Sequence, residues 1–261
     1  MQDQNSVNGR RSFIYKSAVI FTGTILGFKC FSKAWACDFS QKNPQIAIII
    51  DDIGFSRSRL EKFLEIGAPL TFSILPKLPR SGIFAGNIHD LGYEVMLHQP
   101  MEPVDPNLDP GPGAIYVKDS PGKIVNVIEQ NIAETPFVTG INNHMGSRFT
   151  ASGREMKEAL TVIKDSGLFF VDSLTTNRSK AYGTAKKLDM LTVRRNIFLD
   201  NIQNVPSIQA QLEKLKRLAL NSGHAIGIGH PFPETASAIN QFYQNIKNTD
   251  LSMVPVSRLL S

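Results

Sequence analysis

The chain has 261 residues, 42% hydrophobic and 20% charged, values that exclude a disordered or fibrous protein. The length fits one large α/β domain or two small ones. The net charge of +5 is concentrated near the start, because residues 1–36 hold five of the 28 basic residues and one of the 23 acidic residues. The rest of the chain has a net charge of only +1, and nothing in it points to nucleic acid.

The first 36 residues have the pattern of an export signal. Arg10 and Arg11 give a positive start, Ala18–Phe28 is apolar, and Ala34–Ala36 forms a cleavage site of small-residue type. The apolar stretch is too short to span a bilayer comfortably. The segment Arg10–Lys16 resembles a twin-arginine signal, with Sec export and an uncleaved anchor as alternatives. We expect a periplasmic or secreted protein. It would contact the membrane only if the signal stayed uncleaved.

The chain has only two cysteines, Cys30 and Cys37, so it can form at most one internal disulfide. Cleavage after Ala36 would remove the first, so the exported body would have no internal disulfide. A lipid-modified Cys37 is disfavoured because Trp35 precedes the small residue at the cleavage point. We expect residues 37–44 to be a linker and residues 45–261 to be one domain.

The first expected strand carries two adjacent acids at its end. Ile46–Ile50 is an apolar run without a polar face, typical of a strand buried on both sides in a parallel sheet. Asp51 and Asp52 follow it, and Ser56 can cap a helix over Arg57–Ile66. Two adjacent carboxylates repel each other unless a cation or a shared proton offsets the repulsion.

The same strand–helix pattern then repeats along the chain. The further expected strands are Leu70–Leu75, Tyr93–Leu97, Val138–Ile141, Leu168–Val171, Thr192–Leu199 and Ala225–Ile228. The further expected helices are Ser81–Leu91, Ser120–Glu134, Ser152–Ser166, Ser179–Leu188, Ser207–Asn221 and Glu234–Ile246, before a closing extended segment, Ser252–Leu260. Seven units predict a parallel sheet with helices outside, and we expect an irregular seven-stranded (β/α) barrel, closed or incompletely closed. A doubly wound open sheet is the alternative.

Acidic, imidazole and guanidinium side chains recur where the expected strands end. They are Asp51, Asp52, His98, Glu102, His144, Arg148, Asp172, Asp200 and His230. Barrels place their active sites at this end of the sheet, so the sequence predicts a metal or acid–base site there. His89 and His224 lie away from strand ends and are better explained as structural.

Three of these residues could bind one metal ion. Carboxylate and imidazole ligands suit Zn²⁺ and related divalent metals, and a catalytic metal needs three protein ligands and one open position. Asp52, His98 and His144 could supply them from three strands. A cation there would relieve the repulsion between the two acids, and Asp51 would be free to act as a base on the attacking water.

The motifs IIIDDIG, LHQPMEP, NNHMGSRF, VDS and IGHP, in this order, resemble the divergent polysaccharide deacetylase family. The resemblance covers Gln45 to about Leu260. It implies a barrel of the glycoside hydrolase/deacetylase type and the hydrolytic removal of acetyl groups from acetylated glycans. It also implies that Asp51 is the general base, Asp52 a metal ligand and His230 the general acid.

The sequence departs from the superfamily pattern at the metal histidines. That pattern has two histidines four positions apart, where this chain has His98 and Glu102, with Pro100 between them excluding a helix. We expect His144 to replace the second histidine and Glu102 to be a fourth ligand or a partner of the ligands. The usual Arg- and Pro-containing motif is absent, so Arg148 could hold Asp51 or the substrate.

The remaining site residues complete a hypothesis for amide hydrolysis. Asp172 or Asp200 would orient His230, and Asn143 and Ser173 would bind substrate. The expected protein is an exported, zinc-dependent deacetylase of N- or O-acetylated polysaccharide. The alternatives are an inactive barrel that binds a glycan or an envelope protein, and a glycoside hydrolase that uses Asp172 and Asp200 as paired carboxylates.

Overall fold

The computed structural model describes residues 43–260, so the export segment and both cysteines lie outside the described residues. The described strands are β1 (Gln45–Ile53), β2 (Thr71–Ile74), β3 (Glu94–Met101), β4 (Val138–Met145), β5 (Phe169–Asp172), β6 (Thr192–Arg194), β7 (Ile197–Phe198), β8 (His224–Gly229) and β9 (Ser252–Met253). The α-helices among these residues are α1 (Arg57–Leu64), α2 (Ser81–Asp90), α3 (Pro121–Glu134), α4 (Gly153–Asp165), α5 (Ala181–Lys187), α6 (Val205–Ser222) and α7 (Pro233–Ile246). None of these helices is long and apolar enough to cross a membrane.

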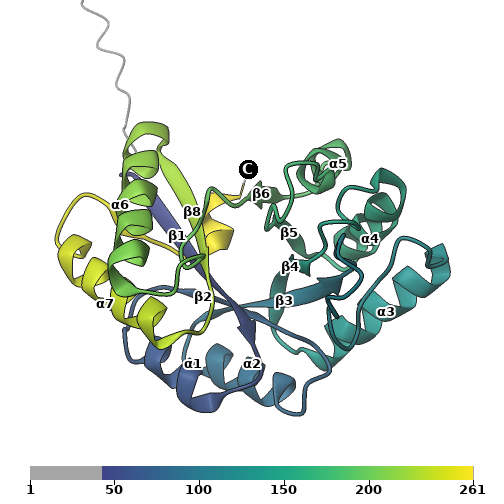
Figure 1. The fold of residues 1–261 in the computed structure, drawn as a ribbon, viewed down its shortest axis with the longest axis horizontal. Coiled ribbons are helices and arrows are strands. Elements are labelled where there is room, and N and C mark those ends of the chain that lie inside the picture. The colour runs from purple at the N-terminus through teal and green to yellow at the C-terminus, as the bar shows by residue number, and fades with distance from the viewer. Residues whose placement is uncertain (1–42, 261) are drawn as a thin grey trace, which may run out of the picture. The chain divides into compact units, whose positions relative to one another are not determined.

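The strands form one curled parallel sheet with the helices along its outer side (Figure 1). The strand order is β6-β5-β4-β3-β2-β1-β8-β7, and β9 pairs with β1 beside this path. All pairings within the sheet are parallel. The expectation of an irregular (β/α) barrel is therefore confirmed, and the doubly wound alternative is wrong, because that fold needs helices on both faces of its sheet.

The expected sixth strand, Thr192–Leu199, is divided between the two ends of the sheet. β6 pairs with β5, whereas β7 pairs with β8. Arg195 and Asn196 cross from one end to the other, because the Arg195 backbone N–H bonds to the Asp172 carbonyl and that of Asn196 to the Ile226 carbonyl. The chain thus bridges the two edges of the barrel, and one expected strand becomes two.

Alternation along β1 divides its apolar side chains between two cores. Ile46, Ile48 and Ile50 pack outward against the helices. Ala47 and Ile49 point inward, where they meet the C-terminal segment. A strand buried on both faces has no polar side, which explains the continuous apolar run in the sequence.

The C-terminal segment fills the barrel interior at the end opposite the acids. It was expected to be extended, but it forms β9 and then a 3₁₀ helix, η1 (Val256–Leu259). The backbone N–H of Val256 donates to Thr71 Oγ1, and that hydroxyl donates to Glu94. Val256 and Leu259 pack on the inward side chains of the strands. Tertiary packing in the barrel overrides the extended pattern of this segment.

We predict that Gly140→Ala destabilises the protein. A Cβ at Gly140 would lie 2.3 Å from the Phe169 ring, whereas a Cβ at Gly86, within α2, would meet nothing within 4 Å. Overpacking a buried site costs about 1–3 kcal/mol, and Gly→Ala in a helix adds up to about 1 kcal/mol. Urea unfolding should show a lower free energy of unfolding for Gly140→Ala and an equal or higher one for Gly86→Ala. Equal behaviour of the two variants would contradict this packing.

Candidate metal centre and active site

A bulge in β1 turns Asp51 and Asp52 toward the same imidazole. Adjacent strand residues normally point to opposite faces. Here the register between β1 and β2 shifts between Ile50 and Ile53, so that three steps along β1 match two along β2. Asp52 has a positive φ of 56°, a conformation that aspartate adopts more readily than most residues. Bulges re-aim side chains in this way, and the two acids approach His98 Nε2 to 3.6 and 3.2 Å.

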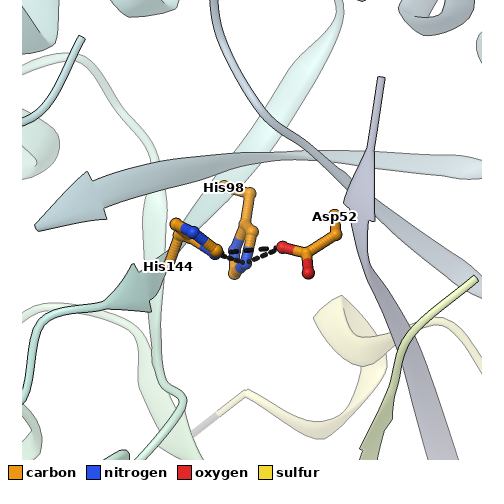
Figure 2. Close-up of side chains that lie close together, drawn as sticks. All are labelled: Asp52, His98 and His144. Atoms are coloured by element: carbon orange, nitrogen blue, oxygen red, sulfur yellow. Dashed lines mark hydrogen bonds and ion pairs between the residues drawn. The ribbon is translucent and has the colours of Figure 1, made fainter. Parts of the chain in front are cut away.

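Asp52, His98 and His144 bring three ligand atoms together from β1, β3 and β4 (Figure 2). Asp52 Oδ1 lies 3.2 Å from His98 Nε2 and 3.0 Å from His144 Nδ1. The two ring nitrogens are 3.2 Å apart. These three residues were predicted as metal ligands, and the structure places their donor atoms in one small triangle.

The triangle fits a divalent cation. Asp52 Oδ1 is buried, and within the described residues it receives no hydrogen bond of acceptable geometry despite the two nearby ring nitrogens. Zinc bonds of about 2.0–2.1 Å place tetrahedral ligand atoms about 3.3 Å apart, close to the observed separations of 3.0–3.2 Å. One carboxylate and two imidazoles suit zinc and related divalent metals.

The two adjacent acids differ in their ionisation. Burial raises the pKa of Asp51, and this effect outweighs the opposing effects of His98, His230 and a hydrogen bond from Asn142. Burial acts in the same direction on Asp52, but the imidazoles of His144 and His98 hold its pKa well below its usual range. Asp52 is therefore the acid that is favoured as an anion, and Asp51 is the carboxylate with greater affinity for a proton.

His230 and Asp200 form a second imidazole–carboxylate pair. Asp200 Oδ1 lies 2.8 Å from His230 Nδ1, and Asp200 Oδ2 accepts hydrogen bonds from the His230 backbone N–H and the Thr235 hydroxyl. Burial alone lowers the pKa of His230, but Asp200 outweighs it and, together with Asp51 and Asp52, raises the pKa to about 9. At neutral pH this imidazole carries a proton that it can donate.

Glu102, expected as a fourth ligand or a partner of the ligands, contacts Arg148, which was expected to hold Asp51 or the substrate, and neither belongs to the ligand triangle. Glu102 Oε2 accepts a 2.7 Å hydrogen bond from the Val117 backbone, and Glu102 Oε1 lies 3.3 Å from Arg148 Nη1. The Glu102 carbonyl also accepts from the backbone of Arg148 and Phe149. Because β3 continues to Met101, Glu102 begins the following loop and joins it to the loop after β4.

Asp172 bonds to the segment that leads into α5. Its carboxylate accepts hydrogen bonds from the Leu174 and Tyr182 backbone and from the Ser179 hydroxyl, and so it fixes the entry to α5. Of the two acids expected to orient His230, the structure pairs only Asp200 with it. Asp172 and Asp200 belong to separate hydrogen-bond networks.

Asn143 and Ser173, the candidate substrate-binding residues, lie in different environments. The amide of Asn143 donates to the Met145 carbonyl and accepts from the Ser173 backbone N–H, so it links the ends of β4 and β5. The Ser173 hydroxyl faces the acids instead and accepts a hydrogen bond from Asn142.

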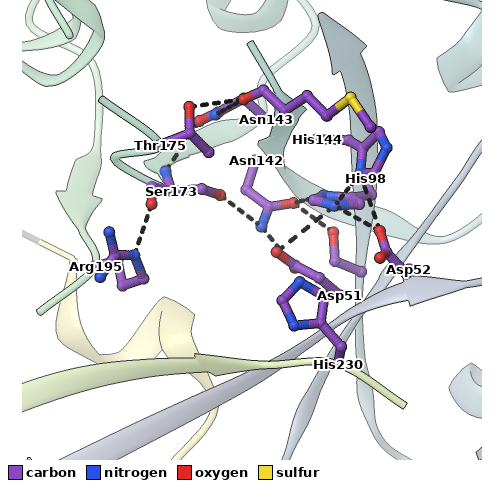
Figure 3. Close-up of polar contacts among 12 residues, drawn as sticks. Asp51, Asp52, His98, Asn142, Asn143, His144, Ser173, Thr175, Arg195 and His230 are labelled. Carbon is purple, nitrogen blue, oxygen red and sulfur yellow. Dashed lines mark hydrogen bonds and ion pairs between the residues drawn. The ribbon is translucent and has the colours of Figure 1, made fainter. Parts of the chain in front are cut away.

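Sequence reasoning missed two residues of the site, Asn142 and Arg195. Asn142 donates to Asp51 and contacts His98, as Figure 3 shows. Strand alternation could have found it, because Asn142 lies two positions before His144 and shares its face. Arg195 donates to the carbonyls of Ser173 and Leu174 and lies over the Phe198 ring. No signal marked Arg195, because it lay inside a predicted continuous strand.

A cavity of about 120 Å³ opens beside these groups. Its lining includes Asp52 and His230 together with the aromatic residues Phe55 and Phe232. A larger hollow of about 420 Å³ lies between α1 and α2, and none of the predicted site residues lines it. The small cavity therefore reaches two of the reactive side chains, Asp52 and His230.

A model of the family "Divergent polysaccharide deacetylase" matches residues 48–260. The chain is also 30% identical over 218 residues to the uncharacterized protein YibQ of Escherichia coli (strain K12), an alignment that covers 83% of this chain and 67% of that protein.

Two solved structures are similar in fold. The uncharacterized protein ATU2773 from Agrobacterium tumefaciens C58 has a TM-score of 0.80 and 25% identity, covering 84% of this chain and 89% of that one. The catalytic domain of peptidoglycan N-acetylglucosamine deacetylase from Eubacterium rectale ATCC 33656 has a TM-score of 0.51 and 12% identity, covering 82% and 88%. The second likeness concerns the fold alone.

We predict that Asp200→Asn lowers the pKa of His230 from about 9 toward its ordinary value near 6.5, because the buried charge that stabilises the imidazolium is lost. NMR titration of the imidazole, in chelator so that no cation contributes, measures this shift. Asp172→Asn is the matched control and should leave the titration of His230 unchanged. An unchanged pKa in Asp200→Asn would contradict the pairing.

We further predict that His144→Ala loses bound metal and that Glu102→Gln keeps it, because His144 belongs to the ligand triangle and Glu102 to a loop contact. Elemental analysis after dialysis against dilute zinc compares the two variants with the wild type. Loss of zinc in Glu102→Gln, with retention in His144→Ala, would reverse the assignment.

Proposed function

Because the chain belongs to the divergent polysaccharide deacetylase family, we propose that it is a metal-dependent hydrolase that removes acetyl groups from N- or O-acetylated polysaccharide. One observation carries the proposal: a three-residue ligand group, a buried carboxylate and a proton-carrying imidazole meet at one end of the barrel. Amide hydrolysis needs an activated water, a base and an acid.

The ligand group is Asp52, His98 and His144 in this proposal. A divalent cation held by them, zinc or another metal, would supply a Lewis acid that activates water and polarises the acetyl carbonyl. The role of the protein is to present one anionic and two neutral ligands from three adjacent parts of the sheet. The strand register sets their spacing, so substrate binding need not assemble it.

Asp51 takes the proton of the attacking water in this mechanism. Its carboxylate is buried and lies 3.6 Å from His98 Nε2, beside the ligand triangle. Burial raises the pKa of Asp51 and so strengthens it as a base. The Asn142 amide holds one of its oxygens, leaving the other oriented toward the ligand group.

His230 gives a proton to the departing amine nitrogen. Asp200 accepts the hydrogen bond of Nδ1, which leaves Nε2 to act on the substrate, and raises the pKa so that the imidazole is protonated at neutral pH. His230 and Asp52 line the same cavity, so the acid and the ligand group face one bound molecule. The aromatic wall formed by Phe55 and Phe232 suits the apolar face of a sugar ring.

The substrate is proposed to be a cell-envelope glycan. Residues 1–36 have the composition of an export signal, which would place the hydrolase in the periplasm or outside the cell. The related fold of a peptidoglycan N-acetylglucosamine deacetylase supports an N-acetylated sugar as the first substrate to test. Nucleic acid is not an expected partner, and an envelope protein is one only if the site proves inactive.

The test is to measure acetate release from acetylated chitin and peptidoglycan oligomers by zinc-loaded protein. Released acetate, with no new reducing ends, supports a deacetylase. New reducing ends without acetate would instead indicate cleavage of glycosidic bonds. Binding of the oligomers without either product would indicate an inactive glycan-binding barrel.

We predict that Asp51→Asn lowers kcat by about 10²- to 10⁴-fold, the usual contribution of general-base catalysis. Asparagine keeps the shape of the side chain but cannot accept the proton of the water. Zinc content, measured in parallel, should stay at the wild-type level, because Asp51 is outside the ligand triangle. If Asp51→Asn loses zinc, the roles of the two adjacent acids are misassigned.

A further inference from the structure

Asn142 makes contacts with four side chains through one amide group, as Figure 3 shows for those that it labels. Its Nδ2 donates to Asp51 Oδ1 at 2.8 Å and to Ser173 Oγ at 3.1 Å. Its Oδ1 accepts from Ser73 Oγ at 2.5 Å and lies 2.8 Å from His98 Nδ1. The residue is completely buried, so water cannot replace any of these partners.

The partners determine which way the amide faces. The NH₂ end points to Asp51 Oδ1, and the carbonyl oxygen accepts from the Ser73 hydroxyl. The carbonyl oxygen then faces His98 Nδ1, which has to carry the hydrogen. In its neutral form, His98 is therefore the tautomer with a lone pair on Nε2, the atom that lies in the ligand triangle.

The four contacts use the full capacity of the amide, which is two N–H donors and two acceptor positions. They also come from four different strands or strand ends: Asp51 from β1, Ser73 from β2, His98 from β3 and Ser173 from the end of β5. Asn142 in β4 thus joins neighbouring strands across the barrel interior. A buried, fully satisfied network of this kind is rigid, and losing one member leaves other groups without partners.

We propose that Asn142 is a positioning residue that fixes both the metal-binding tautomer of His98 and the orientation of Asp51. The part of the inference that concerns Asp51 as a base rests on the proposed function. The part that concerns the His98 tautomer does not. One amide would then couple metal affinity to the placement of the base. The carbonyl half acts on His98, and the NH₂ half acts on Asp51.

The two halves can be separated by substitution. Asn142→Asp keeps an oxygen that can accept from His98 Nδ1 but replaces the donor to Asp51 with a second oxygen. Asn142→Ala removes both halves. Asn131→Asp is the matched control, because Asn131 is also completely buried and donates to Gln99 and to the Gly113 carbonyl, away from the ligand triangle.

The experiment compares these three full-length variants with the wild type by three measurements. Zinc affinity is measured by competition with a chromophoric chelator, the His98 tautomer by ¹⁵N chemical shifts in chelator, and kcat and KM by acetate release. Asn142→Ala should weaken zinc binding about 10- to 100-fold, as for other groups that orient metal ligands, and should change the ¹⁵N pattern of His98. Asn142→Asp should keep zinc affinity and tautomer but lower kcat about 10- to 100-fold with little change in KM.

The result that overturns the proposal is wild-type zinc affinity and an unchanged His98 tautomer in Asn142→Ala. Equal loss of zinc in both Asn142 variants would also overturn it, because the retained oxygen should support His98. The same losses in Asn131→Asp would show general destabilisation instead of positioning. A wild type that releases no acetate rejects the proposed function, while the zinc and tautomer measurements still decide whether Asn142 positions His98.

Discussion

The site depends on one irregularity of the sheet, the bulge in β1. Without the additional residue between Ile50 and Ile53, Asp51 and Asp52 would point to opposite faces of the strand. With it, Asp51 keeps the inward direction set by Ala47 and Ile49, and Asp52 turns toward the histidines of β3 and β4. The left-handed φ of Asp52 is a local conformational cost at this bulge.

Environment gives different roles to side chains of the same type. Asp51 and Asp52 are neighbours, yet burial dominates the pKa of the first and two imidazoles dominate that of the second. Among the histidines, His98 presents Nε2 to the ligand triangle because Asn142 occupies its other nitrogen, whereas His230 is held by Asp200 as a proton donor. When their environments push the pKa values of two titratable groups apart, the difference is the usual basis for assigning the acid and the base.

The barrel interior is divided into an apolar and a polar layer, and the reactive side chains lie in the polar layer. At the N-terminal ends of the strands, Val256 and Leu259 of η1 pack against inward apolar side chains. At the C-terminal ends, the inward positions are Ser73, His98 and Asn142, which bond to one another across strands. The polar layer lies above a packed core, so its side chains have little freedom and the fold sets the positions of the Asp52, His98 and His144 donor atoms.

From local patterns and the geometry of parallel sheets, the sequence predicted the alternation of strands and helices, the reactive ends of the strands and the grouping of Asp52, His98 and His144. It could not determine contacts between segments distant in the chain. Tertiary contacts divide Thr192–Leu199 between two edges, bring Glu102 into a loop contact with Arg148, bind Asp172 to the segment that leads into α5 and place Asn142 among four partners. A one-residue bulge or a strand that changes partner leaves almost no mark on hydrophobic periodicity, yet it reverses the direction in which a side chain points.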